Sequence, residues 1–134
     1  MSLRLLPLIA ALGLITACSG GGLGSARDAA LAASNASLPA PYRDGLVTER
    51  AVAGGADLVL EIRFGDARVA QLDAKPDLRD ALVADETEAM AELCGVQALQ
   101  PYLAAGGVVR RRFIDADGAL FFEATLPANA CPTS

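Results

Sequence analysis

Two pairs of short segments after residue 40 carry the patterns of β-strands. In segment 57–64 every second residue is apolar, so these residues would share one face of a strand, and the pattern indicates a half-buried strand. The apolar residues are Leu58, Leu60, Ile62 and Phe64. Segment 46–53 precedes it across a pair of glycines, so the two segments predict a β-hairpin. Segments 108–114 and 119–126 predict a second hairpin, because the turn between them ends in Gly118, which readily adopts positive φ.

Segment 76–94, between the hairpins, predicts the main helix. A proline suits its first position, and apolar residues recur at nearly helical spacing as far as Cys94. These apolar residues are Leu78, Leu82, Val83, Met90 and Leu93. Shorter helical pieces are expected at 26–36, with a disordered linker as the alternative, and at 96–105, interrupted by Pro101. The whole predicts a small two-layer α+β domain, in which an antiparallel sheet of two hairpins packs against one main helix.

The first eighteen residues are typical of an export signal. A charged start with Arg4 leads into the apolar run 5–15, and Ile15-Thr16-Ala17-Cys18 follows. The run is too short to cross a bilayer, so we expect a targeting segment and not a spanning helix. Ordinary signal peptidase requires a small residue three positions before the cut, where cleavage before Cys18 would place Ile15. The segment therefore resembles a bacterial lipoprotein signal, with an uncleaved or plainly secreted form as the alternative.

The resemblance to lipoproteins implies that residues 1–17 are removed and that Cys18 receives a thioether-linked diacylglycerol and an N-terminal acyl chain. At about 0.8 kcal/mol per buried CH₂, three chains would hold the protein on the membrane essentially permanently. Ser19 stands where lipoproteins of the inner membrane commonly carry Asp, so the resemblance favours the periplasmic face of the outer membrane. Residues 18–24 then form the lipidated cysteine and a flexible tether, and residues 25–134 a single domain.

With Cys18 as the lipid acceptor, Cys94 and Cys131 remain as an even pair in an oxidising compartment. We expect them to form a disulfide. Two free thiols or a metal pair are the alternatives, and neither has support, because the sequence contains no histidine and no close cysteine spacing.

The charge balance of 11 basic against 16 acidic side chains argues against a nucleic-acid partner. Several acidic residues fall on the 76–94 helix, where we expect a solvated face without a basic partner and not a metal or acid/base site. They are Asp80, Asp85, Glu86, Glu88 and Glu92. Without histidine and without a visible nucleophile–base pair, we expect no enzymatic activity.

The turn Asp115-Ala116-Asp117-Gly118 contains a fragment of a calcium-binding EF-hand loop. Aligning Gly118 with the glycine of that loop puts Phe113 and Ala124 where carboxylates are required. We therefore interpret the segment as a hairpin turn. No metal and no cofactor are expected apart from the lipid on Cys18.

Three consecutive arginines stand out in this acidic sequence. In a strand, Arg110 and Arg112 share one face, and Arg111 lies on the opposite, apolar face. Arg110 and Arg112 are a candidate stripe for binding an anion or an acidic partner, since arginine binds phosphate and carboxylate groups bidentately. The alternative is structural, because charge can guard an edge strand or form cross-strand pairs with Glu123 and Glu61.

The order of parts in the second half carries a resemblance. A helix ends in Leu93-Cys94, a leucine-rich turn spans 99–103, Gly106-Gly107 precedes a strand, and Asp117-Gly118 leads to a last strand that runs toward Cys131. This order resembles an uncharacterised family of small exported Gram-negative proteins, which have aromatic and small polar residues in place of the three arginines. The resemblance covers residues 40 to 131, implies an α+β fold with a bond between the two cysteines, and supplies no activity.

These features together predict a non-catalytic lipoprotein on the periplasmic face of the outer membrane. Its role would be that of an accessory, assembly or protein-binding module for another envelope protein. The alternative is a binder or inhibitor of a soluble periplasmic ligand or enzyme.

Overall fold

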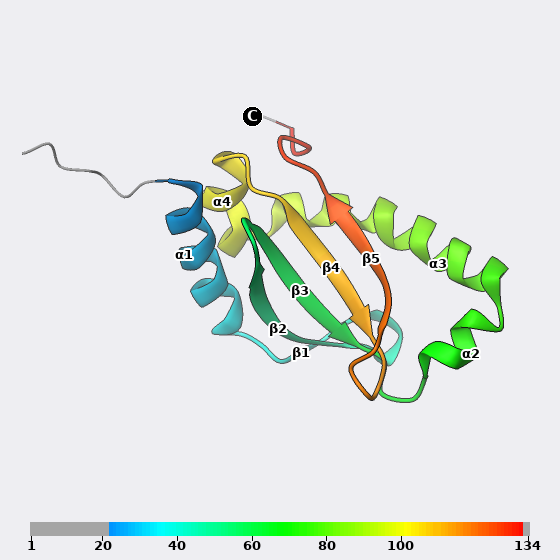
Figure 1. The fold of residues 1–134 in the computed structure, drawn as a ribbon. Coiled ribbons are helices and arrows are strands. Elements are labelled where there is room, and N and C mark those ends of the chain that lie inside the picture. The colour runs from blue at the N-terminus through cyan, green and yellow to red at the C-terminus, as the bar shows by residue number, and fades with distance from the viewer. Residues whose placement is uncertain (1–21, 133–134) are drawn as a thin grey trace, which may run out of the picture.

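The structure is a computed structural model that describes residues 22–132. These residues form a five-stranded sheet that helices cover on one face (Figure 1). The strand order is β1-β2-β3-β4-β5. The strands are β1 (Ala40–Pro41), β2 (Val47–Gly54), β3 (Asp57–Arg63), β4 (Val109–Ile114) and β5 (Leu120–Leu126). The helices are α1 (Leu23–Asn35), α2 (Val69–Asp73), α3 (Pro76–Ala89) and α4 (Gln100–Ala104), with 3₁₀ turns η1 (Arg43–Gly45), η2 (Met90–Gly95) and η3 (Gln97–Leu99). The predicted α+β class is confirmed.

Both predicted hairpins are present, and each strand end falls within one residue of its predicted position. The turns contain Gly55 (φ 61°) and Gly118 (φ 83°), as the need for positive φ predicts. The carboxylate of Asp115 fixes the second turn, because it accepts hydrogen bonds of 2.8 Å from the backbone N–H groups of Asp117 and Ala119. The acidic residue at this turn therefore has a structural role.

The two hairpins join through a parallel pair of strands, which corrects the antiparallel sheet expected from the sequence. Residues 58–63 of β3 pair in parallel with residues 109–114 of β4. The connection through α2, α3, η2, η3 and α4 leads the chain back to the end of the sheet at which β3 begins (Figure 1). Pairing between hairpins depends on this path, which the pattern within each hairpin does not contain.

The N-terminal helix is confirmed as α1, which lies along the edge of β2. The side-chain amide of Asn35 pairs with both the N–H and the C=O of Ala51, each at 2.8 Å, and so occupies part of this edge. The helix begins at Leu23, inside segment 18–24 assigned to the tether. Gly22 is its N-cap, and residues 18–21 of that tether lie outside the described residues.

The helices after β3 differ from the expected pattern in three ways. The predicted 76–94 helix is α-helical only to Ala89 and continues as the 3₁₀ turn η2. Leu78, expected in the core, is 47% exposed. Pro101 lies in the first turn of α4 and does not interrupt a helix, because the first turn of a helix leaves its N–H groups without intrahelical partners. Among the described helices, none has the length and apolar character that crossing a bilayer requires.

The covered face of the sheet carries two apolar clusters. One cluster lies under α1, η2, η3 and α4, and its largest fully buried side chains are Tyr102, Leu58, Met90, Leu99 and Val109. The other lies near α2 and α3 and is rich in aromatic rings, with Phe113 stacked on Phe122 at 4.5 Å between ring centroids. Along β4, Arg111 lies between Val109 of the first cluster and Phe113 of the second. A buried polar group therefore separates the two clusters.

Candidate functional site

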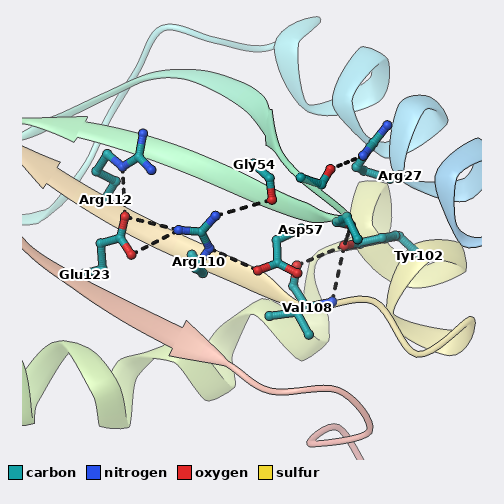
Figure 2. Close-up of polar contacts among 10 residues, drawn as sticks. Arg27, Gly54, Asp57, Tyr102, Val108, Arg110, Arg112 and Glu123 are labelled. Atoms are coloured by element: carbon teal, nitrogen blue, oxygen red, sulfur yellow. Dashed lines mark hydrogen bonds and ion pairs between the residues drawn. The ribbon is translucent and has the colours of Figure 1, made fainter.

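The open face of the sheet, opposite the helices, carries Arg110 and Arg112 beside Glu123 (Figure 2). Arg112 Nε donates to Glu123 Oε1 at 2.9 Å, and Arg110 Nη1 lies 3.2 and 3.1 Å from the two oxygens of the same carboxylate. Arg110 Nε also donates to Asp57 Oδ2 at 3.1 Å. The cross-strand pairing with Glu123 that the sequence suggested as the structural alternative is therefore present.

All three guanidinium nitrogens of Arg110 have an acceptor, because Nη2 also lies 3.4 Å from the carbonyl oxygen of Gly54 (Figure 2). The arginine side chain lies close over Gly54 and Val59. A Cβ atom at position 54 would collide with Arg110 and stand 2.7 Å from Val59 Cγ2. Val59 has no exposed surface although it points away from the helices. Arg110 therefore closes part of the open face by itself.

A row of alternating charges crosses the same face. The strand register aligns Arg50, Glu61, Arg112 and Glu123 on four neighbouring strands, and Arg50 Nε donates to Glu61 Oε2 at 3.0 Å. Burial raises the pKa of the Glu123 carboxyl, but the hydrogen bonds from Arg112 and Arg110 outweigh it and lower that pKa. The charges of the open face are thus neutralised within the sheet. The anion-binding role of Arg110 and Arg112 stays a prediction.

Arg111 points to the covered face and joins a polar cluster beneath the sheet. Its Nη2 donates to Glu92 Oε1 at 2.7 Å, and its guanidinium carbon lies 4.9 Å from the centre of the Tyr42 ring. The Tyr42 hydroxyl donates to Glu86 Oε2 at 2.7 Å. Arg43 Nη2 donates to Glu92 Oε1 at 2.9 Å and contacts the Tyr42 hydroxyl. Burial and the hydrogen bond to Glu86 raise the pKa of Tyr42 to about 12, so the phenol stays neutral at physiological pH.

Two of the helical carboxylates correct the expected solvated face. Glu86 is 7% exposed, and Glu92 pairs with two arginines, Arg43 and Arg111. The other three acidic residues named in the prediction are exposed as expected: Asp80, Asp85 and Glu88. The sequence did not reveal the exceptions, because their basic partners lie in a loop and a strand that reach the helix only through the tertiary fold.

A pocket of about 200 Å³ opens beside this cluster, between the end of α1, β2 and the turns η2 and η3. Its lining includes the apolar residues Leu38, Leu60, Leu93 and Leu99, and the hydroxyl residues Ser34, Ser37 and Thr48. Arg111 is the one charged residue of the lining. Its side chain is 6% exposed, and among the described residues its Nη1 atom has no hydrogen-bond partner. Sequence reasoning missed this pocket, and the only signal was an arginine on the apolar side of a strand.

Cys94 and Cys131 are joined by the predicted disulfide, which closes a separation of 37 residues. Both cysteines pack against the first apolar cluster of the covered face. The bond therefore ties the turn η2, which supplies one wall of the pocket, to the segment that follows β5. Cys18 lies outside the described residues, so its lipid stays a prediction.

No family model matches the sequence, and no curated protein is similar to it in sequence. Solved structures share its fold at low identity. A protein of Pseudomonas aeruginosa assigned as secreted superposes with a TM-score of 0.59 at 13% identity, over 82% of this chain and 93% of that one. The pilotin EpsS of the Vibrio vulnificus type 2 secretion system superposes with a TM-score of 0.53 at 19% identity, over 84% of this chain and 94% of that one. These similarities establish the fold.

Proposed function

We propose that this protein is a non-catalytic accessory lipoprotein of the Gram-negative envelope, which binds a segment of another envelope protein. In this proposal, a lipid on Cys18 holds it on the periplasmic face of the outer membrane. The observation that carries the proposal is the fold shared with a type 2 secretion pilotin over 84% of this chain. The signal segment that ends in Ala17-Cys18 supports the same location independently of the fold.

The distribution of charge supports a binding role over a catalytic one. The arginines of the open face are paired with carboxylates, and Asp115 holds backbone N–H groups of a turn. The phenol of Tyr42, with its pKa raised to about 12, is a poor base near neutral pH. These titratable groups thus serve the structure, and the small apolar pocket beside Arg111 is a feature that suits a partner.

The size of this pocket favours a protein partner over a soluble ligand. A pocket for a drug-sized ligand usually encloses about 300–1,000 Å³. The pocket beside Arg111 encloses about 200 Å³, which suits one side chain of a larger partner. At this pocket, a side chain of a protein partner therefore has more support than a drug-sized soluble ligand.

Co-purification after cross-linking tests the partner. The full chain, processed and membrane-bound, is cross-linked in intact cells, solubilised in detergent and isolated by a C-terminal tag. We expect one envelope protein in constant ratio, and a Glu88→Gln variant, altered at an exposed position of α3 that does not line the pocket beside Arg111, serves as the matched control. Recovery of the chain alone, or only of soluble periplasmic proteins, would contradict the proposal.

Labelled fatty acid tests the anchor. Cys18→Ser should block processing, leave a longer precursor and abolish incorporation of the label, because the thioether forms on this sulfur. Cys94→Ser is the control, since it alters a cysteine that the disulfide already occupies. Unchanged labelling of the Cys18 variant would rule the anchor out.

A further inference from the structure

Within residues 22–132, Arg111 is the one residue with a buried side-chain atom that lacks a hydrogen-bond partner, and it also lines a pocket. Its Nη2 is bound to Glu92, but Nη1 has no partner among the described residues. An unsatisfied buried donor destabilises the fold, and more so when it is charged. A group that brings an acceptor into the pocket would remove that cost.

The charge of the surrounding cluster indicates what kind of acceptor fits. Arg43 and Arg111 are balanced by Glu86 and Glu92, and Tyr42 is neutral. An incoming anion would meet the carboxylate of Glu92, which already lies 2.7 Å from the same guanidinium group. A neutral carbonyl oxygen accepts the hydrogen bond without that repulsion.

The rest of the lining fits the same chemistry. Apolar residues, four of them leucines, make up most of the lining, which also includes the hydroxyl groups of Ser34, Ser37 and Thr48. A hydroxyl can accept a hydrogen bond from an amide N–H or donate one to a carbonyl. The volume of about 200 Å³ accommodates a single aliphatic residue. The lining therefore matches an uncharged peptide unit that carries an apolar side chain.

We propose that this pocket binds one aliphatic residue of a partner polypeptide, whose main-chain carbonyl accepts a hydrogen bond from Arg111 Nη1. The inference rests on the proposed function and specifies the chemistry of the partner segment. Nη1 has almost no accessible surface, so the partner reaches it by shifting a neighbouring wall side chain. Side-chain rearrangements of this kind are common at interfaces.

Small probes test the chemistry without knowledge of the partner. The processed full chain, labelled at leucine methyl groups and held in detergent micelles, is titrated with N-acetyl-leucine amide and followed by NMR. We expect saturable shifts at Leu60, Leu93 and Leu99. N-acetyl-glycine amide should bind more than tenfold more weakly, because it lacks the side chain that the pocket buries. Absence of saturable shifts at these methyl groups would overturn the inference.

Variants test the hydrogen bond and the pocket separately. Arg111→Met should weaken binding of N-acetyl-leucine amide about tenfold, while Arg112→Met, on the opposite face of β4, should leave it within about twofold. Ala98→Phe should fill the pocket and abolish binding while Arg111 stays in place. Equal binding by the parent and by both pocket variants would contradict the proposed site, and Ala98→Phe decides the matter if Arg111→Met fails to fold.

A charged probe tests the neutrality of the ligand. N-acetyl-leucine carries a carboxylate, and we expect it to bind no more tightly than the amide at low salt. Tighter binding that depends on salt and on Arg111 would show a carboxylate site and overturn the neutral carbonyl. In the cross-linking experiment, an Ala98→Phe variant that keeps its partner would contradict this inference alone. A parent that captures no envelope protein would instead contradict the proposed function, whatever the probes do.

Discussion

The two faces of β4 place the same side chain in opposite circumstances. On the open face, each guanidinium nitrogen of Arg110 has an acceptor, and Arg112 shares the carboxylate of Glu123. On the covered face, Arg111 is almost fully buried, packs on the Tyr42 ring and keeps one nitrogen without a partner. A partly exposed arginine can change rotamer or donate hydrogen bonds to water. A buried arginine can donate only to the acceptors that the tertiary fold places beside it.

The difference also separates structure from candidate function. Exposed ion pairs each contribute about 0–1 kcal/mol, so the pairs of the open face mainly hold strand register and cover Val59. The buried cluster is costly to build and stays incomplete at the pocket. We therefore assign the candidate binding role to the covered face, and not to the arginine pair that the sequence indicated.

Removing the disulfide should have the largest effect, because the bond restrains the whole loop between Cys94 and Cys131 in the unfolded chain. Cys94→Ser or Cys131→Ser should each destabilise the domain by about 4 kcal/mol, the loop entropy for a separation of 37 residues. The double variant should add little, since each single change removes the same restraint. Melting temperatures of the three variants check this. Additive losses would mean that the two side chains also stabilise the fold independently.

Truncating the buried arginine should cost more than truncating its exposed neighbour. Arg111→Ala should lower the free energy of unfolding by about 2–3 kcal/mol, because it removes a buried stem from the Tyr42 ring and leaves Glu92 with one partner fewer. Arg112→Ala should cost less than about 1 kcal/mol. Urea unfolding of both variants provides the measurement. Equal losses would break the distinction between the two faces.

The stability of the open face should depend on pH through Glu123. Its folded pKa lies below the unfolded value of about 4.3, so its stabilisation is present above that pH and is lost as pH falls through the folded pKa. The parent should therefore melt higher than Glu123→Gln at pH 6, by an amount that shrinks toward pH 3. Glu88→Gln, at an exposed position of α3, serves as the control. A difference that stays constant with pH would show that the carboxylate is not the source.

Neutralising the open-face arginines should have the smallest effect on binding. We expect the Arg110→Gln/Arg112→Gln double variant to bind glycerol phosphate as weakly as the parent across a salt titration, because Asp57 and Glu123 already occupy these guanidinium groups. An NMR titration measures this binding, and the cross-linking experiment compares partner retention in the two proteins. A clear, salt-dependent loss in the double variant would restore the anion-binding interpretation of the stripe.

Local sequence patterns were sufficient to predict the strands, the two hairpins and α1. They also predicted which face of β4 each of the three arginines occupies. Strand alternation, glycine at positive φ and helix-forming composition act over a few residues, so each is visible without the fold. The cysteine pair was predictable for a similar reason, since an even count in an exported chain leaves few partners. The signal ending in Cys18 rests on the same kind of local pattern, but it lies outside the described residues and stays a prediction.

Only the tertiary structure decided the rest. The parallel pairing of β3 with β4 follows from the path of a connection of 45 residues between Arg63 and Val109, and no local pattern specifies that path. Tyr42 and Glu86 are 44 positions apart, and Glu92 and Arg111 are 19 apart. These contacts therefore form only when segments distant in sequence pack together on the covered face. The pocket beside Arg111 depends on the same packing, because its lining comes from several separate elements and no single element forms it.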